Sequence, residues 1–145
     1  MQKNLETLGD IQYTQEEIDF ALELQRNNGK PEIGIDGKIR PLRETLNSPG
    51  GGSTDSGDVS YNVPVVSLAA TTAPKGVPWH SWSVVASSGM SIGHKGMLHA
   101  AKALGMTMVD IFKDSKLREN IKKEFDEKIG AVSYTHLTLP TTVFV

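Results

Sequence analysis

A continuous apolar run, VPVVSLAAT at residues 63–71, constrains the fold of this chain more than any other segment. It is rich in β-branched residues and shows no polar alternation, which is typical of a strand buried on both faces. Such a strand requires a sheet whose two faces are covered by other layers. After the turn APKGVP, the segment WHSWSVVASS at residues 79–88 predicts a second extended piece.

Helix signals flank these two segments. Thr14 and Glu17 form a capping box, and Gly29 supplies a C-terminal stop, which together predict a helix over about residues 15–27. The capping position also explains the adjacent acidic pair, Glu16 and Glu17, without any catalytic role. Residues 30–57 hold several prolines and glycines and are expected to be irregular; so long a loop is usually functional or flexible.

Two further helices are predicted towards the C-terminus, over about residues 92–113 and 115–129. Asp114 is the N-cap of the second of these helices, and Gly130 ends it. The first carries one apolar stripe at helical spacing, made of Met97, Ala101, Leu104, Met108 and Ile111.

The order helix, strand, strand, helix, helix predicts an α/β fold that is incomplete in this chain. A covered parallel sheet needs several strands, and only two or three are found. The sequence of 145 residues has 38% hydrophobic residues and a formal charge of −2, which does not predict a nucleic-acid or membrane partner. Cysteine is absent, which excludes a disulfide framework or thiolate zinc site and is compatible with the cytoplasm. No leader or membrane-spanning run is found.

The last residues, VSYTHLTLPTTVFV, have no charge and a different composition from the rest of the chain. The part at residues 132–142 resembles the translation of a transposase sequencing adapter. We therefore expect residues 1–131 to be protein and residues 132–145 to be a non-native tail, so His136 receives no functional weight. The alternative is a natural C-terminal strand, because Thr and Val favour strands.

His80 is the first candidate for a metal ligand. It stands between two tryptophans in a turn that follows the predicted buried strand, where α/β folds commonly bind ligands, and imidazole is the commonest metal-binding side chain. A surface or packed histidine is the alternative. His94 and His99 are five residues apart on a predicted helix and therefore do not form an i, i+4 zinc pair.

Two other segments contain candidate binding residues. His94 and Lys95 lie in the first turn of a predicted helix, where backbone N–H groups favour a substrate carboxylate; the alternative is a capping or solvent-facing role. Asp55 and Asp58 lie in the loop GGGSTDSGDVSYNVP, whose spacing fits neither an EF-hand nor a phosphate loop. Taken alone, this pair fits a polar turn.

Three motifs in this order, GGSTDSGDVSYNVPVVSL, PWHSWS and SIGHKGMLHAAKAL, resemble the p-aminobenzoyl-glutamate hydrolase B subunits. These proteins are part of a large family of two-zinc amidohydrolases and exopeptidases. The resemblance implies that the chain is the C-terminal segment of a zinc-exopeptidase-like catalytic domain, with helices packed on a mixed sheet. It also implies a longer parent enzyme that works as a homodimer or a two-subunit assembly.

The resemblance implies that His80 is the last zinc ligand. Asp55, Asp58, His94 and Lys95 become candidates for contacts with substrate or for support of the metal ligands. Two divalent metals, zinc or alternatively manganese, and a small amide substrate such as aminobenzoyl-glutamate are implied. The general base and the other ligands would lie outside this chain, so no catalytic residue is assigned here and the chain alone is expected to be inactive. The alternative is a small non-enzymatic α/β binding or interaction module.

Overall fold

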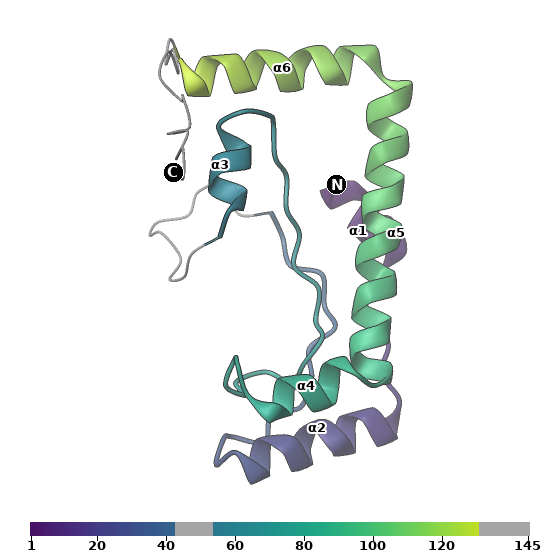
Figure 1. The fold of residues 1–145 in the computed structure, drawn as a ribbon. Coiled ribbons are helices and arrows are strands. Elements are labelled where there is room, and N and C mark those ends of the chain that lie inside the picture. The colour runs from purple at the N-terminus through teal and green to yellow at the C-terminus, as the bar shows by residue number, and fades with distance from the viewer. Residues whose placement is uncertain (43–53, 131–145) are drawn as a thin grey trace, which may run out of the picture. The chain divides into compact units, whose positions relative to one another are not determined.

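Helices make up all the regular structure of the described residues, 1–42 and 54–130, in this computed structural model (Figure 1). Within these ranges there is no β-strand. The helices are α1 (Gln2–Leu8), α2 (Gln15–Asn27), α3 (Ser56–Ser60), α4 (Trp82–Ser88), α5 (Ser91–Lys113) and α6 (Ser115–Ile129).

The chain divides into two compact units. The described part of the first unit is residues 1–42 and 66–113, with α1, α2, α4 and α5. The described part of the second unit is residues 54–65 and 114–130, with α3 and α6.

α2 begins and ends where its sequence predicts. The Thr14 hydroxyl accepts a hydrogen bond from the Glu17 backbone N–H at 3.3 Å, and the Glu17 carboxylate accepts one from the Thr14 N–H at 2.7 Å. This reciprocal capping box satisfies two backbone donors that a helix start otherwise leaves unpaired. At the other end Gly29 adopts a φ of 62°, a conformation that favours glycine.

Ile92 and four smaller residues, rather than the predicted apolar stripe, form the buried face of α5. Ile92, Gly93, Gly96, Ala103 and Thr107 are buried. A Cβ atom on Gly96 would lie 2.2 Å from the Thr71 carbonyl oxygen, so the helix and the segment before α4 approach within backbone distance. The stripe residues Met97, Leu104 and Met108 are instead exposed.

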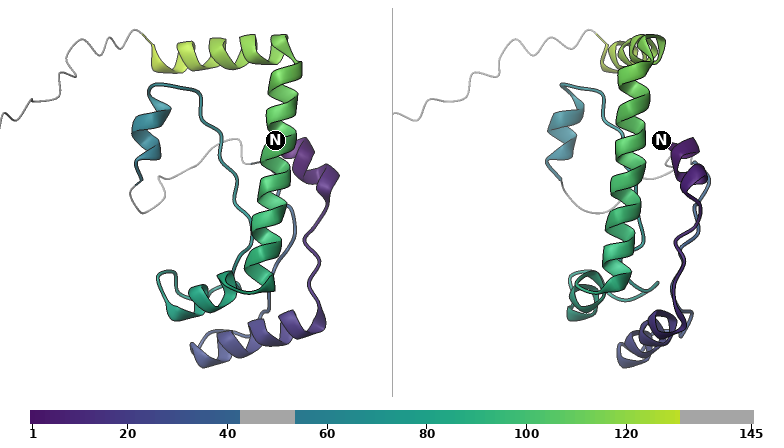
Figure 2. Two further views of the ribbon diagram at one scale, coloured as in Figure 1. Left: turned by 45° about the vertical axis from the view of Figure 1, so that its right-hand side comes forward. Right: turned by 90° about the vertical axis from the view of Figure 1, so that its right-hand side faces the viewer.

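α1 was not predicted from the sequence, because its N-cap, Met1, makes no capping hydrogen bond. Its position depends on contacts with α5, which Figure 2 shows running beside it. The buried Asn4 amide donates to the Thr107 hydroxyl at 3.1 Å and to the Asp110 carboxylate at 2.7 Å. Tertiary contact therefore holds a helix that is too short to be stable alone.

The predicted α/β fold with a mixed sheet is wrong for the described residues, which are helical without a sheet. The run over residues 63–71 has no regular secondary structure, and Val63, Val65 and Val66 are exposed rather than buried. A strand is defined by hydrogen bonds to a neighbouring strand, and an apolar sequence cannot supply that neighbour.

The second predicted extended piece is also wrong, because Trp82–Ser88 forms α4. Ser83 and Ser87 lie four residues apart and form its buried side, while Val85 is exposed. Small polar residues at helical spacing set the buried face of this segment.

The second unit has no buried residue on either of its helices. α6 begins as predicted, with the Asp114 carboxylate accepting from the Leu117 N–H at 2.9 Å, and ends at Gly130. Its Lys–Asp and Lys–Glu pairs are exposed and contribute little to stability. The serine and glycine at positions 56 and 57, predicted to be irregular, belong to α3.

Two predictions fall outside the described residues, namely the non-native tail over 132–145 and most of the glycine-rich loop before Thr54. Within the described residues, no helix has the length and apolar character needed to cross a membrane.

Candidate functional site

His80 lies at the tip of a tight turn between Val77 and α4. Its φ of 61° is the only positive φ among the described residues other than glycine. The Ser81 hydroxyl donates to the Pro78 carbonyl at 2.6 Å and closes the turn, so this serine does not cap α4 with its side chain. The left-handed conformation is costly for most side chains and is often found at functional sites. The turn therefore presents an imidazole on a constrained backbone.

The His80 side chain is exposed, and no described residue forms a hydrogen bond with its imidazole. A catalytic zinc site uses about three protein ligands. Among the described residues there is no group of three or more histidine, aspartate or glutamate side chains that could hold a metal ion. His80 can therefore act as one donor, and the remaining donors of any such site must come from elsewhere.

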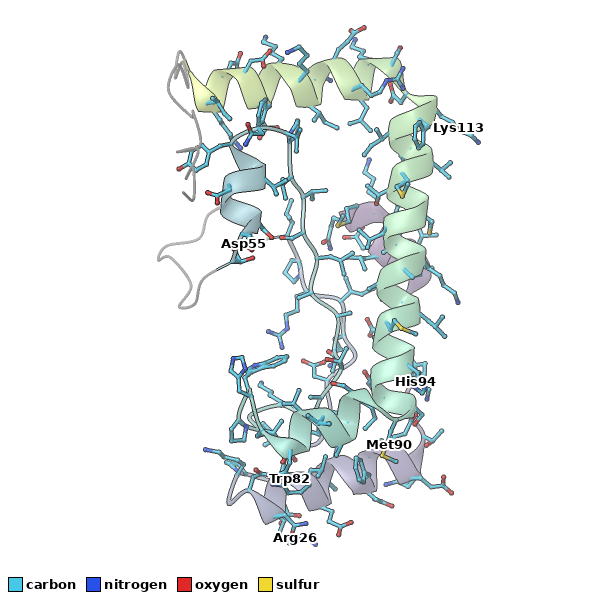
Figure 3. The ribbon with its side chains drawn as sticks, in the orientation of Figure 1. Arg26, Asp55, Trp82, Met90, His94 and Lys113 are labelled. Atoms are coloured by element: carbon cyan, nitrogen blue, oxygen red, sulfur yellow. The ribbon has the colours of Figure 1, made fainter. Side chains whose placement is uncertain are left out.

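His94 lies in the first turn of α5, as predicted, and is exposed (Figure 3). Its backbone N–H donates to the Met90 carbonyl at 3.0 Å. The neighbouring Gly93 is buried, and a Cβ there would lie 2.2 Å from the Ser88 carbonyl oxygen. The end of α4 therefore packs closely against the start of α5, while the His94 side chain stays accessible to solvent.

Lys95 is part of a polar junction between α2 and α5. Its ammonium group donates to the Glu17 carboxylate at 2.6 Å and to the Gln12 carbonyl at 2.9 Å. It also lies 5.6 Å from the centre of the Tyr13 ring, within cation–π range. A role for Lys95 in substrate binding stays a prediction, and it would require this amine to leave or share partners that it already has.

Burial and charge shift the pKa values of two groups in this junction. Burial of Glu17 would by itself raise its pKa, but hydrogen bonds from Lys95, Ser91 and the Thr14 backbone outweigh it and lower the pKa to about 2. Burial raises the pKa of Tyr13 to about 12, with further contributions from the Glu17 and Asp36 carboxylates. Glu17 is therefore a permanent anion at neutral pH, held by the capping box and by Lys95.

Asp55 and Asp58 belong to the second unit, whereas His80 belongs to the first. Asp55 precedes α3 without capping it through its side chain, and Asp58 lies in the first turn. Both are exposed, and the hydrogen bonds nearby, such as Ser60 hydroxyl to Gly57 carbonyl at 2.6 Å, are local. Their assigned roles near the substrate or metal stay predictions.

A cavity of about 660 Å³ in the first unit was missed by sequence reasoning. α1 and the segments 37–42 and 66–73 form its walls, with Trp79 and His99 completing them. Trp79 directly precedes His80, so the turn with the candidate ligand adjoins the cavity. Only the tryptophans around His80 hinted at this, because the walls come from separate parts of the sequence.

Comparison with known proteins gives one informative match, to one of the p-aminobenzoyl-glutamate hydrolase B subunits, that of Escherichia coli strain K12. The two sequences are 32% identical over 167 aligned residues, and the match covers 99% of the chain. The chain is homologous to a segment of this hydrolase component. The resemblance indicated by its three motifs is therefore confirmed.

The homology is partial with respect to the E. coli relative, because the chain spans 34% of the length of that protein. No family model matches the chain. No solved structure matches it either. The relationship is thus established by sequence, over a segment of about one third of the relative's length.

Proposed function

We propose that this chain is part of a metal-dependent amidohydrolase that cleaves an amide of an N-acyl or aryl amino acid, such as p-aminobenzoyl-glutamate. The observation that carries the proposal is the homology with a p-aminobenzoyl-glutamate hydrolase component along nearly the whole chain. The exposed, backbone-constrained imidazole of His80 supports it, since that residue matches a zinc ligand of the family implied by the sequence motifs.

His80 would hold one metal ion through one ring nitrogen, while its other nitrogen would need an acceptor to fix the ring. Zinc, when bound, supplies a Lewis acid that polarises a carbonyl and makes water acidic near neutral pH. The constrained turn would fix the backbone of His80 and thus the direction of its Cα–Cβ bond, which lowers the backbone entropy lost on binding. Asp55, Asp58, His94 and Lys95 are proposed to act on the substrate side or to support ligands.

The general base and the other metal ligands are proposed to lie in parts of a longer protein, since Glu17 is already engaged by Lys95 and by its helix cap. We accordingly expect the chain alone to bind zinc weakly and to show no zinc-dependent amide hydrolysis. A cytoplasmic location and a homodimeric or two-subunit assembly are part of the same proposal. Hydrolysis by the purified chain would contradict it.

The test replaces the matched third of the E. coli relative by this chain and then introduces His80→Ala. We expect the zinc content to fall and the release of p-aminobenzoate to drop by about a hundredfold or more. Lys75→Ala is the matched control, because that exposed side chain is near the same turn and has no assigned role. If His80→Ala retains zinc and rate, the amidohydrolase assignment of this residue is wrong, and the non-enzymatic module becomes the better description.

A further inference from the structure

The charges around the 660 Å³ cavity of the first unit all have one sign. Among the described residues that line it, Lys38 and Arg40 bring positive charge, and there is no aspartate or glutamate. The whole chain, by contrast, has 17 acidic against 15 basic residues and a formal charge of −2. Because an excess of positive charge around a hollow raises the local concentration of anions, the cavity is suited to a ligand that carries a negative charge.

These basic side chains are available to such a ligand. In the described part of the chain, the Lys38 ammonium and the imidazole of the half-buried His99 have no hydrogen-bond partner. The Arg40 guanidinium lies 3.4 Å from the Asp36 carboxylate in a largely exposed pair. An exposed ion pair contributes little to stability, so Arg40 can turn from Asp36 to a ligand carboxylate at small cost.

The other walls of the cavity are apolar, and one of them is aromatic. Leu5, Val66 and Leu68 are among the aliphatic lining residues. Trp79 also lines the cavity, yet 73% of this residue is exposed. An open indole face favours a second flat ring, which it can stack upon, over an aliphatic chain of the same size. The volume of about 660 Å³ is in the range of small-molecule sites.

Hydrogen bonds hold the two non-helical walls of the cavity in place. The Ile11 N–H donates to the Gly37 carbonyl at 3.0 Å, which fixes the wall that carries the two cations. The Thr71 hydroxyl of the opposite wall donates to the Asp36 carbonyl at 2.6 Å and so joins the two walls. The cavity is therefore formed before any ligand enters, which lowers the ordering cost of binding.

We infer that this cavity binds a small aromatic carboxylate. The ring of the ligand stacks on Trp79, and its carboxylate accepts hydrogen bonds from Lys38 and Arg40, with His99 as a further polar contact. Two sources of this chemistry are an intact aryl amide of an amino acid and the free aryl acid that its hydrolysis releases. The choice of these two compounds rests on the proposed function, whereas the charge and the aromatic wall of the cavity do not.

The test titrates the chain, in the presence of a metal chelator, with p-aminobenzoyl-glutamate and with p-aminobenzoate. The chain has two tryptophans, so its NMR spectrum has two indole N–H signals, which single substitutions assign. We expect the Trp79 signal to shift on titration and the Trp82 signal to stay in place. Trp82 is the matched reference because it is 60% exposed but does not line the cavity. No shift with either compound, or an equal shift of both signals, would overturn the inference.

Two partial probes test the chemistry of the ligand. Aniline has the ring without a carboxylate, and N-acetylglutamate has carboxylates without an aromatic ring. The better of the two aryl carboxylates should bind about tenfold more tightly than either partial probe. If a partial probe binds equally well, the cavity does not select an aromatic carboxylate. Tighter binding of the amide would identify the intact substrate as the occupant, and tighter binding of the acid would identify the released product; either result supports the inference.

Substitutions of exposed residues locate the binding without disturbing the core. Trp79→Leu and Lys38→Met should each weaken binding about fivefold or more. Trp82→Leu and Lys30→Met, at exposed positions outside the cavity lining, should leave it unchanged. Equal affinities for all four variants would mean that the ligand binds elsewhere. Because the chelator removes metal ions, these results do not depend on zinc or on His80, and the proposed function can fail separately.

Discussion

α2 and the turn that carries His80 belong to the same unit but are built in opposite ways. α2 is tied down along its length: Glu17 binds Lys95, Gln25 binds two loops, and Asn28 donates to the Ser83 hydroxyl at 2.7 Å. His80 has a strained backbone and, among the described residues, a side chain without a hydrogen-bond partner. The contrast shows where polar contacts stabilise this chain and where an imidazole is left exposed.

The largest effect is expected at Gln25, which is fully buried. Its amide donates to the Gly34 and Lys75 carbonyls at 2.9 and 2.8 Å, and its oxygen accepts from the Gly34 N–H at 2.8 Å. Gln25→Leu removes all three of these hydrogen bonds to the backbone and should lower the free energy of unfolding by about 3 to 5 kcal/mol, measured by urea titration. Gln15→Leu, on the exposed side of the same helix, should change it by less than about 0.5 kcal/mol.

The second largest effect is expected at acidic pH, where the contacts of Glu17 at the start of α2 should weaken and the free energy of unfolding should fall. Because the pKa of Glu17 is lowered to about 2 from an ordinary 4.5, the anion stabilises the folded state above pH 4.5, and this contribution is lost as the pH falls from 4.5 to 2. The loss should amount to about 3 kcal/mol. Between pH 2 and 4.5, Glu17→Gln should make the free energy of unfolding depend less on pH. Glu16→Gln should leave that dependence unchanged. An equally steep curve for Glu17→Gln would show that Glu17 is not the group responsible.

α5 should be sensitive to substitution at Gly96, which lies against Thr71 in the segment that leads to the His80 turn. Gly96→Ala places a Cβ against the Thr71 carbonyl and should cost about 2 kcal/mol of stability through overpacking. Gly105→Ala, on the same helix with no atom within 4 Å of its Cβ position, should instead stabilise by about 0.5 to 1 kcal/mol. Thermal unfolding of the two variants gives the comparison directly. The same sign for both would contradict the close approach.

The smallest effect is expected at the turn itself. His80→Gly relieves the positive φ but adds chain entropy to the unfolded state, so stability should change by no more than about 1 kcal/mol. His94→Gly, within the regular helix α5, should destabilise by about 1 kcal/mol. If His80→Gly were the more damaging of the two, the turn would depend on a contact of the imidazole, and His80 would lose its character as an available ligand.

The sequence predicted those parts of the fold whose signals are local. The capping box placed α2, and Asp114 with Gly130 placed α6, because a cap depends on residues within one turn. The strand predicted over residues 63–71 is wrong, because pairing needs a second extended backbone. α1 was not predicted, because the hydrogen bonds that hold Asn4 come from residues more than a hundred positions away.

The sequence likewise predicted only the local features of the candidate site. The motifs indicated the resemblance and made His80 a candidate ligand, which stays a prediction, but they gave no sign that Lys95 would meet Glu17, 78 positions away along the chain. Trp79 and His99 became neighbours of one cavity only through the fold. Composition and spacing can nominate a side chain, whereas its partners are decided by packing.

The buried face of α5 has one further consequence, for how this chain can change over time. Gly93 and Gly96 leave no room for a Cβ atom and Ala103 is fully buried, whereas the side chains of Met97 and Met108 are exposed. In a library of random variants, the buried small positions of this helix should therefore accept fewer replacements than its exposed methionines.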